Sequence, residues 1–177
     1  MDVIEGIGRY APDTARDADA WDRLAAFVKS EPQAFDRNPE TGHVTGSAFV
    51  LSPDMQSVLL THHAKLDLWL QLGGHCDGLR DAVAVAEKEA CEESGLARLH
   101  LVSDAVFDVD IHEIPANARE AAHLHYDVRF LFRAESTDFT VSDESHALAW
   151  VPLARLHDYS RSRSVLVVRD RLARFLP

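Results

Sequence analysis

The chain has 177 residues, of which 46% are hydrophobic and 27% are charged, and its formal net charge is −11. This length suits a single domain that buries its own core without metal or disulfide staples, and no apolar run reaches the length of a membrane span. The acidic surface repels nucleic acid polymers, anionic membranes and phosphorylated small molecules, so a bound cation would be needed to reverse the local field for a phosphorylated substrate.

The start of the chain and its cysteines both favour a cytoplasmic protein. Residues 1–6 have neither the basic start nor the apolar run of a secretory signal. Cys76 and Cys91 are the only cysteines, and we expect both to be reduced thiols. Cys76 is predicted to be an ordinary loop cysteine.

Residues 15–29 are predicted to form an amphipathic helix. Its apolar side chains recur at helical spacing, as Trp21, Leu24, Ala25 and Val28. We expect this helix to pack against the domain, while dimerisation and a substrate lid are the alternatives. Residues 1–41 are therefore predicted to be a helical extension within one domain spanning residues 1–177.

Five segments carry strand patterns. They are residues 43–51, 57–63, 68–72, 105–112 and 123–132. The last two alternate apolar and polar side chains, which predicts strands with one face exposed. A final helix is predicted at residues 164–175. Strands mixed with helices in this way favour a mixed sheet between helical layers, an α+β arrangement.

Three glutamates, Glu89, Glu92 and Glu93, fall near the end of another predicted helix. Asp81 suits its N-cap and Gly95 its C-terminal stop. Positions i, i+3 and i+4 share one helix face, so the carboxylates repel one another unless a hard cation such as Mg²⁺ or Mn²⁺ neutralises them. Taken alone, this pattern favours a solvated acidic face, but its surroundings reverse that preference.

The surrounding segment resembles the Nudix box, the signature of Nudix hydrolases. In that family the spacing is Gly, five residues, Glu, seven residues, Arg-Glu, an apolar residue, any residue, Glu-Glu, any residue, Gly and an apolar residue. The positions in register here are Gly74, Glu89, Ala90, Glu92, Glu93, Gly95 and Leu96. Two positions depart, since Arg80 replaces the first Glu and Lys88 replaces the Arg. With flanking similarities, the resemblance extends over residues 42–156.

The resemblance implies an α/β/α sandwich with a central mixed β-sheet and hydrolysis of a pyrophosphate bond in a nucleoside diphosphate linked to another moiety. It also implies Mg²⁺ or Mn²⁺ as cofactor. By the same resemblance, Glu92 and Glu93 are core metal ligands, Glu89 is a further ligand or the base, and the Gly74 carbonyl completes the shell.

Further roles are implied outside the three glutamates. Lys88 is expected to orient Glu89 as the family arginine does, although it lacks the planar bidentate fork. Glu144, which lies beyond the box, is our candidate for an additional ligand or base, with Asp143 in reserve. Arg80 reverses the family charge, and Asp77 or Asp81 is a candidate replacement.

The alternating strand at residues 123–132 directs His123, His125, Asp127 and Arg129 to one surface. We rank a substrate pocket first, with Arg129 binding phosphate. A hydrogen-bonded polar sheet face ranks close behind, and a zinc site ranks third. Lys65 is a further candidate for a phosphate contact, although an exposed turn lysine is the commoner explanation.

Three other functions compete with the hydrolase. A catalytically weak Nudix domain that binds a nucleotide or metabolite is suggested by Arg80 and Lys88. Gly74 and His75 resemble a pair in isopentenyl-diphosphate isomerases, but the essential cysteine of that group would fall at Gly73, so this interpretation ranks low. A purely structural acidic domain is the third. The expected partner is a small phosphorylated substrate, and a homodimer is left open.

Overall fold

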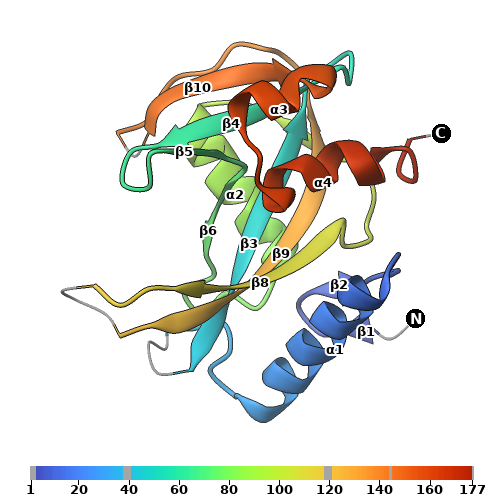
Figure 1. The fold of residues 1–177 in the computed structure, drawn as a ribbon, viewed down its shortest axis with the longest axis vertical. Helices are drawn as coiled ribbons and strands as arrows, with labels where there is room; N and C mark the ends of the chain where they lie inside the picture. The colour runs from blue at the N-terminus through green and yellow to red at the C-terminus, as the bar shows by residue number, and fades with distance from the viewer. Residues whose placement is uncertain (1–2, 38–40, 118–120, 144, 177) are drawn as a thin grey trace.

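An eight-stranded mixed sheet forms the centre of the computed structural model, which describes residues 3–37, 41–117, 121–143 and 145–176 (Figure 1). Its strands are β3 (Gly42–Leu51), β4 (Ser57–His63), β5 (Leu68–Leu70), β6 (Leu72–His75), β7 (Leu99–Leu101), β8 (Asp108–Ile114), β9 (His123–Ala134) and β10 (Ser145–Pro152). A separate two-stranded sheet consists of β1 (Val3–Ile4) and β2 (Gly8–Arg9). The helices are α1 (Ala15–Ser30), α2 (Ala82–Ser94), η1 (Leu153–Arg155), α3 (Leu156–Tyr159) and α4 (Arg163–Leu172).

The main path of the sheet runs β10-β4-β3-β9-β7, with β5, β6 and β8 paired to β4, β3 and β9 respectively. Only β3 and β9 pair in parallel among the described strands, and the other pairs are antiparallel. Every residue of β3 is buried, as expected for a central parallel strand covered on both faces. The α+β class and the mixed sheet predicted from the sequence are therefore confirmed.

Helices cover both faces of this sheet. In Figure 1, α2 lies on one side and α3 and α4 lie on the other. Alternate β3 residues enter two separate cores: Val44, Ala48 and Val50 share one with α2, whereas Phe49 and Leu51 share the other with α4. Among the described residues, no helix has both the length and the apolar character needed to cross a membrane.

The predicted elements differ from the observed ones mainly at their boundaries. The strand expected at residues 68–72 is two strands, because β5 pairs with β4 and β6 pairs with β3. Gly73 and Gly74 consequently lie inside a strand. The strand expected at residues 105–112 begins only at Asp108. The short strands β1, β2 and β7 were missed because two or three residues cannot show a period.

Helix α1 packs against the sheet, which supports the packing interpretation. Trp21 and Leu24 are buried in the core shared with α2, and the Phe27 ring stacks on Tyr126 of β9 with centroids 4.1 Å apart. Backbone hydrogen bonds join the segments on either side of α1 to the loop before α2. The Ala82 N–H donates to the Gly6 carbonyl at 2.8 Å, and the Gly78 N–H donates to that of Phe35 at 2.9 Å.

A buried ion-pair network fills the polar side of β8 and β9. Arg129 is 1% exposed, and its guanidinium contacts Asp127 at 2.7 Å, Asp108 at 2.9 Å and Asp110 at 3.2 Å. Burial alone would lower the pKa of Arg129, but these carboxylates raise it above its usual value, so the guanidinium remains charged. Around Arg129, this sheet face is therefore a buried, hydrogen-bonded polar face, which is the interpretation that ranked second from the sequence.

Helices α1 and α4 explain why this polar face is buried. Asp17 of α1 accepts hydrogen bonds from Arg163 of α4 at 3.0 Å and from Arg171 at 3.2 Å. Arg16 of α1 also bonds Asp110 of β8. Charged side chains of α1, α4, β8 and β9 thus meet on this face of the sheet. The alternating pattern of one strand cannot reveal that helices cover the face.

Replacing Arg129 tests this network. In Arg129→Ala, three carboxylates lose their central cation inside the protein, so we expect the free energy of unfolding to fall by about 3–5 kcal/mol. Urea denaturation followed by circular dichroism measures it. Arg133→Ala is the control, because Arg133 is exposed on the same strand, and its effect should stay within about 0.5 kcal/mol. Equal effects of the two variants would contradict the assignment.

Candidate active site

The ends of α2 determine where its glutamates lie. The Asp81 side chain accepts a hydrogen bond from the Ala84 N–H at 3.1 Å, and Gly95 ends the helix in the left-handed region with φ of 67°. Both caps confirm the sequence prediction. Glu89, Glu92 and Glu93 therefore occupy the last two turns of the helix.

These last turns lie directly against the glycines of β6. The Gly73 N–H donates to a Glu93 carboxylate oxygen at 2.9 Å. A Cβ atom placed on Gly74 would collide with the Glu89 carboxylate, so a larger residue here would displace the end of the Glu89 side chain. Residues predicted to act together are thus brought together.

Lys88 bridges two of the carboxylates. Its Nζ lies 2.9 Å from Glu89 Oε1 and 2.9 Å from Glu92 Oε2. Hydrogen bonds to Glu92 and Glu89 raise the pKa of Lys88 above its usual range. Ion pairs this exposed contribute little to stability, so the carboxylate oxygens can exchange the ammonium for another cation.

The donor set around Gly74 suits a hard divalent cation. It consists of the Glu89 and Glu93 carboxylates and the adjacent β6 backbone, and Lys88 links the Glu92 carboxylate to Glu89, so these side-chain donors are oxygens. Mg²⁺ and Mn²⁺ prefer oxygen ligands, whereas nitrogen and sulfur donors favour later transition metals. The residues present therefore fit the expected cofactor.

A pocket of about 210 Å³ adjoins this cluster. Gly73, Gly74 and Glu93 line it at the cluster, and Leu66 and Leu70 supply apolar surface. Its other walls belong to the polar rows of the sheet, described next. Glu93 thus borders a cavity instead of facing only bulk solvent, which argues against the plain acidic helix face.

Two polar rows cross the sheet beside the pocket. In the first, His43 of β3, His125 of β9 and His112 of β8 are in register, and in the second Thr45, Asp127 and Asp110 are in register. The Asp127 carboxylate also accepts hydrogen bonds from hydroxyls and an amide. These donors are Thr45 at 2.9 Å, Ser47 at 2.7 Å and Gln71 at 3.3 Å.

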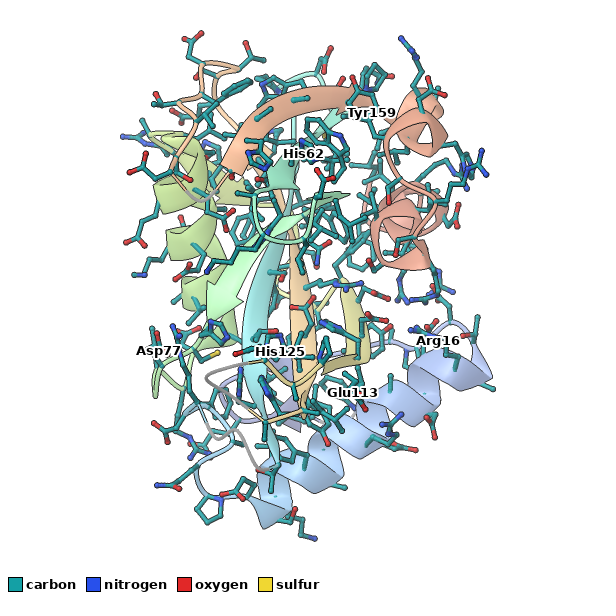
Figure 2. The ribbon with its side chains drawn as sticks, turned by 60° about the vertical axis from the view of Figure 1, so that its left-hand side comes forward. Arg16, His62, Asp77, Glu113, His125 and Tyr159 are labelled. Atoms are coloured by element: carbon teal, nitrogen blue, oxygen red, sulfur yellow. The ribbon has the colours of Figure 1, made fainter. Side chains whose placement is uncertain are left out.

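The first row belongs to a group of closely packed imidazoles. The His125 ring lies 4.6 Å from His43, 5.3 Å from His75, 5.5 Å from His112 and 5.3 Å from His123, measured between centroids. Burial, followed by repulsion from these neighbours, lowers the pKa of His125 to about 2. His125 is therefore a neutral imidazole. Figure 2 shows it low on the sheet, well apart from His62 near the other end.

The remaining predicted site residues lie in different surroundings. Arg129 is enclosed by carboxylates and has no surface for a phosphate, so we assign it a structural role. Lys65 is exposed in the turn between β4 and β5, beside the pocket residues His63 and Leu66. Glu144 lies outside the described residues, and Asp143 beside it is exposed.

The residues around Arg80 do not restore the missing family glutamate. Asp77 pairs with Arg37 at 2.5 Å, and Asp81 caps α2. The Arg80 guanidinium lies over the Phe35 ring, 5.1 Å from its centroid. This arginine therefore packs the loop between β6 and α2 against the segment that follows α1.

Cys76 is a buried thiol. Its side chain lies in the core, and burial raises its pKa to about 12. A thiolate nucleophile at this position is therefore not available near neutral pH. This agrees with the low rank given to the isomerase interpretation.

Sequence reasoning missed several residues of the pocket and its histidine group. These residues are His43, Thr45 and Ser47 of β3, Gln71 between β5 and β6, and His112 of β8, so they come from three separate segments of the chain. The alternating pattern placed His112 on a polar strand face, but only strand register brings it beside His125.

Comparisons with known proteins agree with this geometry. A family model described as the NUDIX domain matches residues 42–170. A search of curated proteins returned no match. The fold is similar to that of a C. elegans Ap4A hydrolase in a binary complex, with a TM-score of 0.54 and 14% identity, covering 75% of this chain and 96% of that chain.

Two further solved structures show the same fold. The E. coli dihydroneopterin triphosphate pyrophosphohydrolase has a TM-score of 0.54 at 14% identity, covering 78% of this chain and 98% of that chain. The NUDIX domain of Shewanella oneidensis NrtR, complexed with ADP ribose, has a TM-score of 0.51 at 17% identity, covering 86% and 98% respectively.

Gly74→Ala tests the fit between β6 and α2. The added methyl group displaces the Glu89 carboxylate, so we expect Mn²⁺ affinity to fall about tenfold or more. Calorimetric titration with Mn²⁺ measures the change. Glu87→Gln removes an exposed acid from the same helix and should bind Mn²⁺ like the parent. Unchanged affinity in Gly74→Ala would show that the cation does not bind here.

Proposed function

Because the chain belongs to the NUDIX family and is a Nudix-type hydrolase, we propose that it cleaves a pyrophosphate bond in a nucleoside diphosphate linked to another moiety, or in a similar small metabolite. The observation that carries this proposal is the contact of Glu89 and Glu93 with the Gly73–Gly74 backbone at the edge of the pocket. The required cofactor is Mg²⁺ or Mn²⁺.

Charge explains why a cation is required. The formal net charge of −11 and three clustered carboxylates oppose the approach of a pyrophosphate. When bound, the divalent cation would neutralise the charge of the pyrophosphate oxygens and lower the pKa of a bound water. Glu92, Glu93 and the Gly74 carbonyl would hold it, and Glu89 is a further ligand or the base.

The other residues have positioning and binding roles in this proposal. Lys88 bridges Glu89 and Glu92 and so orients Glu89. His125 lines the pocket and offers a neutral imidazole to the substrate, with His123 behind it. Lys65 can reach the phosphates from the pocket rim, and Glu144 remains our candidate for an additional base.

The substrate class is supported by what related folds bind. The NrtR NUDIX domain was solved with ADP ribose, and the C. elegans relative is an Ap4A hydrolase. Both molecules are nucleoside diphosphates joined to another moiety. We also propose that the protein acts in the cytoplasm, because Cys76 and Cys91 are both free thiols.

A substrate screen tests the hydrolase directly. With millimolar Mg²⁺, we expect release of a phosphorylated product from at least one dinucleoside polyphosphate, nucleotide sugar, ADP-ribose or nucleoside triphosphate. Glu92→Gln should lower kcat by about a hundredfold or more, because a core ligand is lost. Glu87→Gln should stay near the parent. Turnover that persists after chelation of divalent cations would contradict the proposal.

A second candidate is a Nudix domain that binds such a molecule without cleaving it. Arg80 and Lys88 favour it. The Arg80 guanidinium packs on the Phe35 ring, and Lys88 lacks the planar guanidinium with which an arginine contacts a carboxylate through two hydrogen bonds. This alternative would be established if calorimetry showed tight binding of one of the screened substrates and prolonged incubation with it gave no product.

Substitution of Lys88 separates positioning from binding. We expect Lys88→Met to lower kcat about tenfold with little change in KM, because Glu89 loses its orienting partner. Lys88→Arg should restore or exceed the parent value, since it returns a planar donor to the carboxylates. Steady-state kinetics on the best substrate measures both variants. A change in KM alone would assign Lys88 to substrate binding.

A further inference from the structure

Three histidines on the central parallel strands meet at one point of the sheet. His43 of β3 and His125 of β9 are in register, and His123 lies two residues before His125 on the same face. His43 and His123 are buried, 3% and 5% exposed respectively. The strand pairing thus places these side chains together before any ligand binds.

The spacing of their nitrogens suits a metal ion. Each histidine offers one ring nitrogen, and these nitrogens all lie within 4.8 Å of one another. In a tetrahedral zinc site with bonds of about 2.0–2.1 Å, neighbouring ligand atoms are about 3.3 Å apart. Binding of an ion would therefore require the three imidazoles to rotate toward one another.

Two of the rings each offer a ring nitrogen that no hydrogen bond from the described residues occupies. His123 Nδ1 lies 2.9 Å from the Ala121 carbonyl oxygen, which can only accept, so Nδ1 carries the proton and Nε2 keeps its lone pair. A metal-binding histidine commonly donates its other N–H to a carbonyl in this way. His125 Nε2 is buried without a hydrogen-bond partner in the part of the chain that the structure describes.

We propose that His43, His123 and His125 bind a transition-metal ion of the Zn²⁺ type, at a site separate from the glutamate cluster. Imidazole nitrogens select Zn²⁺, Co²⁺ or Ni²⁺ over Mg²⁺, which prefers the oxygens of Glu92 and Glu93. The two sites differ in donor chemistry, so one protein can hold both classes of cation at once.

The position of His125 determines what the ion can do. His125 lines the pocket together with His75 and His112, whereas His43 and His123 lie behind it. Three protein ligands would leave one coordination position open, and His125 is the ligand that borders the pocket. The ion is therefore placed to bind an anionic group of a molecule held in the pocket.

Calorimetry with the chelator-treated full chain tests the site. We expect one equivalent of Zn²⁺ or Co²⁺ to bind tightly in the presence of millimolar Mg²⁺. His123→Gln and His125→Gln should each weaken that binding by about a hundredfold or more. His146→Gln, which alters an exposed histidine on β10, is the matched control and should bind like the parent.

Two measurements keep the result independent of hydrolysis and of folding. Glu92→Gln should lose Mg²⁺-dependent turnover but retain Zn²⁺ binding, so failure of one site is distinguishable from failure of the other. Zn²⁺ should raise the melting temperature of the parent and not that of a folded His123→Gln variant. In the parent alone, zinc-edge X-ray absorption should show imidazole ligands.

The proposal has clear points of failure. It is overturned by absence of tight Zn²⁺ binding to the parent, by parent-like affinity in His123→Gln, or by loss of Zn²⁺ binding in Glu92→Gln. If His125→Gln does not fold, His123→Gln and the parent's absorption spectrum decide the question.

Discussion

The parallel register between β3 and β9 is the constraint on which the other features depend. Because every β3 side chain has a fixed neighbour on β9, polar residues that are distant in sequence form continuous rows across the sheet. The first row belongs to a group of packed histidines, and the second contains Asp127 and Asp110, which belong to the buried ion pairs around Arg129. A shift of one residue would turn both sets toward the opposite core, so the register is strongly specified.

The acidic helix uses a different principle. Its carboxylates are fixed by the caps of α2 and by close approach to two glycines, and Lys88 balances part of their charge in the free protein. Local features therefore build this site, whereas long-range pairing builds the polar rows. The pocket lies where the two meet, so its lining combines Glu93 of the helix with His125 and Asp127 of the rows.

This contrast explains what the sequence could predict. The glutamates, the caps at Asp81 and Gly95 and most strands depend on neighbours within a few residues, and short-range periodicity identifies them. The burial of Arg129 depends on α1 and α4, at opposite ends of the chain. No local pattern around Arg129 reports those helices, so its assignment as a phosphate contact could be examined only with the tertiary structure in view.

Backbone hydrogen bonds join the N-terminal segment to the loop before α2 and to the first residue of α2. They affect where the boundary of the domain should be drawn. The family match begins at residue 42, yet Ala82 and Gly78 donate to carbonyls of Gly6 and Phe35. A fragment cut at that boundary would uncover the hydrophobic surface beneath Trp21 and leave the loop that presents the glutamates without its scaffold. The segment that matches the family model is consequently shorter than the unit that is packed and hydrogen-bonded together in the structure.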